Sequence, residues 1–415
     1  MHCAEIPPGC RFDTKWIYEE LLLAEHQSSA TTSCLQGSFP LLVSRVTAVV
    51  LQPPSRADVF RLPLAHAADY VGKLFVFVQA DGGWDPTSFC DPKANTPGEP
   101  VINHWAENDK IREAGNIAYA PFASIEAFFE KYYQRMLVIN GVDAQTNSHT
   151  VGIVHNWSGR NSEGYPAMTA LPAASYGADL PVAYLSFGGY FRTGGTIRYT
   201  RLNNAGLLRT VATPYTAGED GRYIGGADWA SIRSRRARTA ERLASAPNPL
   251  PMEARNRALY RSAFAASEGL KSYADEIPAE QQLEQPVEFT TASGNTCRSE
   301  LRRQAQLAVL AFKTGVAVSA DLWLGGFVTH DTHDVDQGVL MANLTDSVDY
   351  LWDYAEVHGV ADRLVVVMGS DFGRTNFYNS QNGKDHWPIG SYVVMEKTSC
   401  GRTGRWARRT ACISR

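Results

Sequence analysis

Four apolar segments of this chain are each followed by polar side chains that could bind a cation or move a proton. The polar clusters lie at 79–85, 143–149, 329–334 and 370–375, and a fifth cluster follows at 384–388. Aspartate and histidine recur in them, and cysteine is absent from all five. Carboxylate oxygens and imidazole nitrogens are ligands of Zn²⁺, Mn²⁺ or a mixed pair of divalent ions. The clusters therefore predict a catalytic site with two divalent metal ions rather than a structural cysteine zinc site.

Hydroxyl and guanidinium groups in the same clusters would complete such a site. Ser148 lies on a polar loop after an apolar segment, where a hydroxyl activated by two metal ions could attack an ester. Thr146 is a second hydroxyl in the same loop, and Arg374 could bind phosphate or sulfate oxygens with two N–H donors. Each residue also has a structural interpretation, Ser148 as a cap or turn residue and Arg374 as the ion-pair partner of Asp371. Because four strand ends share this chemistry, we favour a common polar site.

The apolar segments are the elements that must position these side chains. They are Leu74–Val78, Met136–Ile139, Val316–Leu324 and Leu364–Met368. Near-continuous runs of Val, Leu, Ile and Phe are typical of strands buried on both faces, as in a parallel sheet. Ligands of open α/β sheets bind beyond the carboxyl ends of the strands, which is where the clusters lie. The sequence therefore predicts an α/β fold with a mostly parallel central sheet.

Helical patterns separate and flank the predicted strands. We expect a helix at Leu301–Phe312 before the third strand, and a second helix that ends at Gly359 before the fourth. Residues 200–290 form a predicted helical insertion rich in arginine. Its charges indicate a solvated face, with a docking surface for an acidic partner as the alternative.

Composition excludes several classes of protein. The chain has 415 residues, of which 44% are hydrophobic and 20% charged, and these values exclude a disordered or collagen-like chain. With 39 basic and 43 acidic residues the net charge is −4, so we expect no nucleic-acid partner. No run of about 18 to 20 apolar residues is present, which predicts that the chain has no integral membrane segment.

The two ends of the chain differ from the middle. Residues 1–67 lack a sustained period, and Ala65–Ala67 has the small-x-small form of a signal-peptidase site, which predicts a leader and a periplasmic or secreted protein. An uncleaved disordered arm is the alternative. Residues 397–415 contain six basic residues and no acidic one, so we interpret them as an atypical tail that a frameshift would explain. The folded domain is expected at 68–396.

Several motifs together resemble the Domain of Unknown Function 1501 family, secreted bacterial proteins of the alkaline-phosphatase-like and sulfatase-like superfamily. The resemblance extends from about residue 69 to residue 396. The motifs that match are KLFVFVQADGGWD (73–85), LVINGVDAQTNSH (137–149), HNWSG (155–159), LWLGGF (322–327), VVVMGSDFGRT (365–375) and GKDHWP (383–388).

The resemblance implies an alkaline-phosphatase-like sheet with metal ligands at its carboxyl edge. Asp81, Asp371 and His386 match ligand positions, and Ser148 lies where the nucleophile is expected. The chain departs from the family at Val328, where the family usually has an aspartate before Thr-His. Valine cannot bind a cation, so Asp331 or Asp334 would have to replace the missing carboxylate.

These observations lead to one leading hypothesis and one alternative. The leading hypothesis is an exported, metal-dependent hydrolase of a small or polymer-borne phosphate or sulfate ester. The predicted catalytic residues are Ser148, Thr146 and Arg374, and the predicted ligands of two divalent ions (Zn²⁺, Mn²⁺, Mg²⁺ or Ca²⁺) are Asp81, His330, His333, Asp334, Asp371 and His386. The alternative is a non-catalytic cell-envelope binding or assembly protein that uses Trp84, Trp157 and Trp387 as a ligand surface.

Overall fold

A seven-stranded, mostly parallel sheet forms the centre of the described structure. This computed structural model describes residues 70–397, apart from 203–204, 216–223, 248–249, 266, 293 and 295. The predicted leader at 1–67 and residues 398–415 of the predicted tail lie outside the described residues. In spatial order the strands are β4 (Met136–Asp143), β13 (Ile389–Glu396), β10 (Leu364–Ser370), β1 (Leu74–Ala80), β9 (Ser319–Leu324), β5 (Tyr184–Ser186) and β6 (Tyr199–Arg201).

The pairing of the central strands brings their carboxyl ends to one edge. Strand β1 pairs in parallel with β10 on one side and β9 on the other, so Ala80 lies opposite both Ser370 and Leu324. Strand β13 runs antiparallel to both β10 and β4. The predicted α/β fold with a mostly parallel sheet is therefore confirmed, and the polar segments after β1, β9 and β10 begin side by side.

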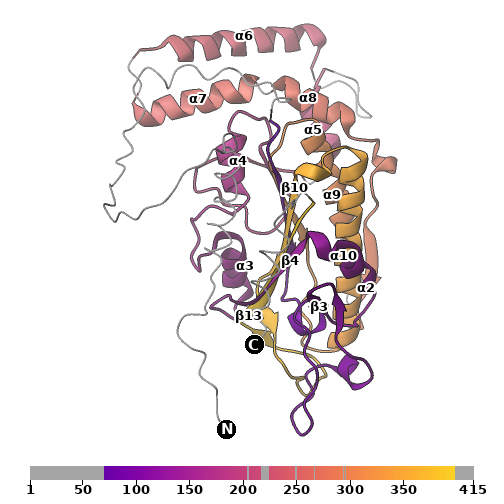
Figure 1. Ribbon diagram of the computed structural model, residues 1–415. Coiled ribbons are helices and arrows are strands. Elements are labelled where there is room, and N and C mark those ends of the chain that lie inside the picture. The colour runs from indigo at the N-terminus through magenta and orange to yellow at the C-terminus, as the bar shows by residue number, and fades with distance from the viewer. Residues whose placement is uncertain are drawn as a thin grey trace, which may run out of the picture.

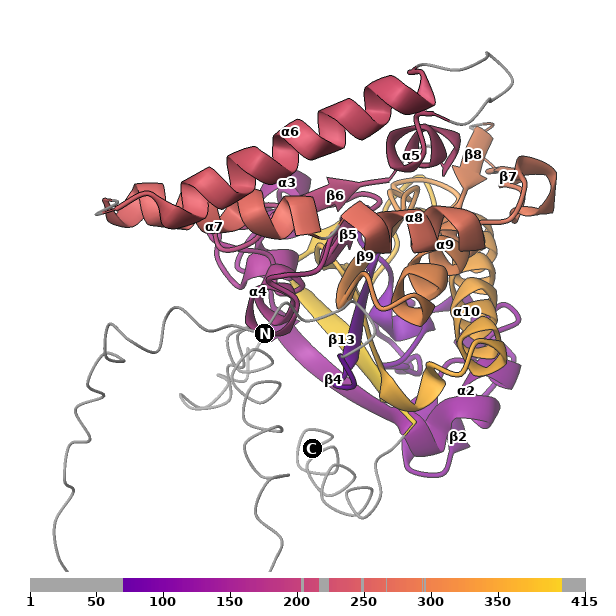
Figure 2. The ribbon, with the colours of Figure 1, turned by 90° about the horizontal axis from the view of Figure 1, so that it is seen from above.

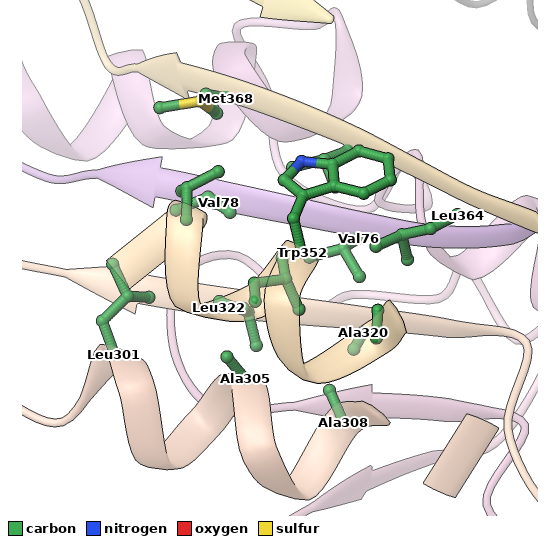
Figure 3. Packing of buried hydrophobic residues seen from close by; sticks show 14 of the residues in the cluster. Val76, Val78, Leu301, Ala305, Ala308, Ala320, Leu322, Trp352, Leu364 and Met368 are labelled. Atoms are coloured by element: carbon green, nitrogen blue, oxygen red, sulfur yellow. The ribbon is translucent and has the colours of Figure 1, made fainter. Parts of the chain in front are cut away.

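Both faces of the sheet are buried, which explains the continuous apolar runs in the sequence. Along β1, Val76 and Val78 belong to one core and Phe75 and Phe77 to the other, because successive side chains of a strand point to opposite faces. Figure 3 shows the first core, where Ala305 and other small residues of a covering helix lie close to the sheet.

Helices cover each face of the sheet (Figure 1). Helices α2 (Glu126–Tyr132), α9 (Leu301–Lys313) and α10 (His333–Val357) lie on one side, and α3 (His149–Ser158) and α4 (Ala170–Tyr176) lie on the other. Helix α10 is followed by Gly359 with φ 71°, a left-handed conformation that favours glycine, so this helix ends where the sequence predicts.

Four α-helices lie in the described part of the segment predicted as an insertion. They are α5 (Ala205–Ala212), α6 (Gly226–Ser245), α7 (Pro251–Ala265) and α8 (Ser267–Glu276). Figure 2 shows α6 and α7 side by side at the periphery, away from the sheet. Three two-stranded ribbons complete the structure: β2 (Arg112–Ala114) with β3 (Ile117–Tyr119), β7 (Val287–Thr290) with β8 (Thr296–Ser299), and β11 (Gly373–Arg374) with β12 (His386–Trp387). Within the described ranges, no helix is long and apolar enough to cross a membrane.

Candidate functional site

An Asp–His pair joins the end of β10 to the start of α3. The Nδ1 atom of His149 lies 2.5 Å from Oδ2 of Asp371, and the Asp371 side chain is fully buried. The other carboxylate oxygen of Asp371 accepts a hydrogen bond from the backbone N–H of Gly82, in the loop after β1. The opposite ring nitrogen of His149, Nε2, is buried and has no hydrogen-bond partner. His149 is therefore oriented by Asp371 and retains one nitrogen for chemistry.

Ser148 directly precedes this histidine at the N-cap position of α3. Its side chain makes no capping hydrogen bond, although serine at this position commonly does. Ser148 is exposed, and its backbone N–H donates to Oγ1 of Thr146, 3.1 Å away. Thr146 therefore shapes the loop with its hydroxyl, while the Ser148 hydroxyl lies at the positive end of a ten-residue helix.

Two further histidines, His330 and His386, face each other at the same edge of the sheet. Their Nε2 atoms lie 3.0 Å apart. Nδ1 of His386 donates to the carbonyl oxygen of Asn147 at 2.7 Å, and Nδ1 of His330 donates to Asp385 at 2.8 Å. The hydrogen bond from His330 lowers the pKa of Asp385, so Asp385 is an ionised acceptor.

This arrangement determines the tautomers of both rings. Because each Nδ1 donates in a hydrogen bond, Nε2 is the nitrogen that carries the lone pair in the neutral form of either ring, and the two Nε2 atoms face each other. Burial, followed by the positive neighbours His149, Arg374 and His330, lowers the pKa of His386, which favours its neutral form. A proton or a cation between the two Nε2 atoms would remove the repulsion. An oxygen acceptor on the opposite nitrogen is also typical of a histidine that binds a metal.

Asp81 lies beside the Asp–His pair at the end of β1. Burial raises the pKa of Asp81, and the negative charge of Asp371 raises it further. Two neighbouring carboxylates whose charges repel each other are stabilised by a cation. His149 and His386 are also adjacent, with ring centroids 4.3 Å apart. Asp81, Asp371, His149, His386 and His330 therefore form one continuous cluster.

The donor types of this cluster fit divalent cations, but the donors do not converge on a single point. Within residues 70–397, gaps excepted, no group of three or more His, Cys, Asp or Glu side chains is placed to hold a metal ion. The facing Nε2 atoms of His330 and His386 and the unpartnered Nε2 of His149 are the nitrogens suited to such an ion. The number and identity of bound ions stay predictions.

Arg374 is buried next to the site, and backbone carbonyl groups surround its guanidinium. Its guanidinium is only 1% exposed and donates to the carbonyl oxygens of Gly82, Gly83, Phe327 and Lys384. Burial lowers the pKa of Arg374 to about 10. In this structure the guanidinium of Arg374 is occupied by backbone carbonyl groups, and its contact with a phosphate or sulfate stays a prediction. These hydrogen bonds connect the loops that follow β1 and β9.

Two of the predicted metal ligands also lie elsewhere. His333 is fully buried, with Nε2 3.0 Å from Asp85 and Nδ1 2.8 Å from the hydroxyl of Thr329, so both ring nitrogens are occupied. Asp334 accepts a hydrogen bond from Tyr378 at 2.7 Å and contacts His104 at 2.8 Å. In this structure His333 and Asp334 therefore lie apart from the histidine cluster, and their role as metal ligands stays a prediction.

The alternative prediction, a ligand surface made by Trp84, Trp157 and Trp387, is contradicted by the burial of two of these residues. Trp84 and Trp157 are fully buried in the two cores, and of the three predicted residues only Trp387 is exposed. A contiguous aromatic surface made by these three side chains is thus absent from the described structure.

Comparison with known proteins identifies the family of this chain. The family model described as "Protein of unknown function (DUF1501)" matches residues 73–396. The chain belongs to this family. A search of curated proteins finds no match to the DUF1501 chain.

Solved structures with a similar arrangement share little sequence with this chain and have low TM-scores against it. One is the alkaline phosphatase from the Antarctic bacterium TAB5, with 7% identity, 83% of this chain and 100% of that chain covered, and a TM-score of 0.30. A 2-O GAG sulfatase has 9% identity, coverage of 79% and 64%, and a TM-score of 0.28. Lipooligosaccharide phosphoethanolamine transferase A from Neisseria meningitidis has 10% identity, coverage of 80% and 49%, and a TM-score of 0.29. Scores this low support no argument about function, so the role of the DUF1501 site rests on its own geometry.

Val328, where the chain departs from the expected DUF1501 pattern, lies at this edge of the sheet. Its side chain is 50% exposed, and it packs against Gly82, where an added Cβ would lie 2.7 Å from the backbone nitrogen of Val328. Asp331, one of the two proposed replacements, pairs through its backbone with Asn382 and is exposed. The cluster therefore includes an apolar side chain beside Asp81.

His149 and Asp385 belong to the site but are not among the residues predicted from the sequence. Both lie in the polar clusters that the sequence identifies, so their residue types were visible. What the sequence lacks is the pairing, because Asp371 and Asp385 lie 222 and 55 positions from their histidine partners.

Proposed function

We propose that this site hydrolyses phosphate or sulfate esters, with Ser148 as the nucleophile and His149 as the base. The observation that supports the proposal is the buried Asp371, which holds His149 by Nδ1 and leaves its Nε2 without a hydrogen-bond partner. The exposed Ser148 is the residue before His149, at the N-cap of α3. A hydroxyl nucleophile, a histidine and an orienting carboxylate are the groups that acyl- and phosphoryl-type transfers require.

The steps follow from the chemistry of these groups. The Ser148 oxygen forms a bond to phosphorus or sulfur as the bond to the leaving alcohol breaks. The hydroxyl proton passes to Nε2 of His149, Asp371 stabilises the resulting imidazolium, and the same proton is then given to the leaving oxygen. In the second step His149 deprotonates a water molecule, whose oxygen bonds to phosphorus or sulfur as the bond to the Ser148 oxygen breaks. The proton on His149 then returns to the Ser148 oxygen, which restores the hydroxyl. The amino end of α3 favours the negative charge of the transferred group.

Divalent ions would assist this reaction. The residues suited to hold them are His330 and His386 for one ion and Asp81 with Asp371 for a second, and such ions supply Lewis-acid stabilisation of developing negative charge. We also propose that the protein acts in the periplasm or outside the cell, in keeping with the small-x-small motif at Ala65–Ala67.

Hydrolysis assays with the full chain test this function. We expect release of nitrophenol from p-nitrophenyl phosphate or p-nitrophenyl sulfate in the presence of Zn²⁺, Mn²⁺, Mg²⁺ or Ca²⁺, and loss of activity with a chelator. Ser148→Ala should lower kcat on the order of 10³-fold or more, as removal of a nucleophile does. Thr150→Ala, at an exposed position of α3, is the matched control and should leave most of the activity. Full activity of Ser148→Ala would overturn the assignment.

A further inference from the structure

A fully buried ion pair lies next to the histidine cluster and is not used by the proposed reaction. The ammonium group of Lys384 donates to Oδ2 of Asp85 at 2.6 Å, to Oδ1 of Asn103 at 2.9 Å and to Oγ1 of Thr87 at 3.1 Å. Lys384, Asp85 and Asn103 are each 0% exposed. The three N–H donors of the lysine thus have three acceptors inside the protein.

The carboxylate of Asp85 is equally well satisfied. Its Oδ1 accepts from the backbone N–H of Thr87 at 2.9 Å, and its Oδ2 contacts Nε2 of His333 at 3.0 Å. Burial by itself would raise the pKa of Asp85, but Lys384 and His333 outweigh burial and hold that pKa well below its usual range. Asp85 is therefore charged and fixed, at the start of the 3₁₀ turn η3 (Pro86–Ser88).

Lys384 is continuous with the segment that forms half of the histidine cluster. The next two residues are Asp385, which orients His330, and His386, which faces it. The backbone of Lys384 is held on both sides, because its N–H donates to Thr329 at 3.1 Å and its carbonyl accepts from Arg374 at 3.0 Å.

The residue before Lys384 adds a steric constraint. A Cβ placed on Gly383 would lie 1.8 Å from the carbonyl oxygen of His330, so the backbone at Gly383 contacts the backbone of His330 directly. A displacement of the backbone at Lys384 would therefore change the distance between His330 and His386.

Stability alone does not account for a buried pair of this kind. Replacing a buried ion pair with apolar side chains of similar size is often neutral or stabilising, because two charges must be removed from water. What such a pair provides here is a fixed position, since the buried ammonium group has acceptors only where Asp85, Asn103 and Thr87 lie together. Here the partner is attached to the loop after β1, the central strand of the sheet.

We propose that Lys384, anchored by Asp85, is a positioning residue that sets the spacing of the His330, Asp385 and His386 side chains. The proposal rests on the proposed function, because it assigns to the pair the task of preparing those histidines for a cation. Lys384 itself touches neither the substrate nor the reacting atoms.

The double variant Asp85→Asn/Lys384→Met tests this role, because it removes both charges together and leaves no unpaired ion. We expect the variant to fold, as judged by thermal unfolding, and to bind Zn²⁺ about 10- to 100-fold more weakly in calorimetry, the loss typical of an orienting partner. Tyr184→Phe is the matched control, because it also removes a buried hydrogen bond, to Asp321, in a different core. It should leave Zn²⁺ affinity unchanged.

A second readout does not depend on metal binding. In ¹⁵N-histidine-labelled protein, His330 and His386 should both carry their proton on Nδ1 in the wild type and show mixed tautomers in the double variant. Unchanged His330 and His386 signals in the double variant would overturn the positioning role, whereas His333, which contacts Asp85 directly, is expected to change in either case. A wild-type protein with those tautomers but no affinity for Zn²⁺, Mn²⁺ or Mg²⁺ would instead contradict the metal-dependent part of the proposed function.

Discussion

Gly152 lies against Asp371 so closely that no larger residue fits between them. A Cβ added to Gly152 would be 2.8 Å from the carbonyl oxygen of Asp371 and 3.1 Å from its Cβ. Gly152 is in the first turns of α3, the helix that begins at His149. The absence of a side chain at this position is thus what allows the helix to bring His149 to the carboxylate.

Gly152→Ala should therefore reduce activity more than stability. Alanine favours a helix over glycine by about 1 kcal/mol, but its methyl group must push α3 away from Asp371. Displacement of a catalytic group by about 1 Å can cost on the order of 10²-fold in rate, so we expect at least a tenfold fall in kcat. Thr150→Ala, an exposed change on the same helix, is the control. Steady-state kinetics together with urea unfolding measure both effects, and unchanged kcat in Gly152→Ala would contradict the required close approach.

Arg374→Lys should destabilise the protein although the charge is kept. The guanidinium donates to the carbonyl groups of four residues in three segments of the chain, and lysine cannot present donors in that geometry. Leaving buried carbonyls unpaired costs about 1–3 kcal/mol for each group, so we expect a fall of about 2–4 kcal/mol in the free energy of unfolding. Arg238→Lys, on the exposed face of α6, should change it by less than about 0.5 kcal/mol. Equal stabilities of the two variants in denaturant titrations would argue against this role for Arg374.

The fold was predictable because burial on both faces leaves a continuous apolar run, as Leu74–Val78 shows. The approximate location of the site was predictable too, since polar residues follow those runs. The direction of individual side chains was not. His330 and His333 are three positions apart, yet Thr332 between them has a positive φ of 46°, which turns the chain so that His333 enters the core. Arg374 has the residue type of an anion ligand, and only the folded loops reveal its carbonyl partners.

Stability should fall as the pH drops below the ordinary pKa of histidine, in part because of His333. Burial lowers the pKa of His333 from 6.5, by more than Asp85 raises it. Between the lowered pKa and 6.5 the unfolded chain binds more protons than the folded one, so the free energy of unfolding rises with pH and falls as pH decreases. The effect is absent well above pH 6.5, where the His333 side chain is neutral in both the folded and the unfolded state. Urea unfolding from pH 5.5 to 8.0 should show this slope, and His333→Gln should flatten it. A parallel dependence in both proteins would exclude His333 as a source.

Val328→Asp should strengthen cation binding. Val328 is half-exposed and packs against Gly82, the residue after Asp81, so a carboxylate at this position would be solvated at little cost in stability. It would restore an oxygen donor two positions before His330 in the sequence, and we expect Zn²⁺ to bind at least about tenfold more tightly, equivalent to about 1.4 kcal/mol. Val328→Asn has the same shape without the charge and separates electrostatics from packing. Calorimetric titration and elemental analysis of the purified proteins measure the difference. Equal Zn²⁺ affinity in the wild type and Val328→Asp would mean that position 328 does not contribute to the site, and a gain shared by Val328→Asn would attribute the effect to polarity rather than to a carboxylate ligand.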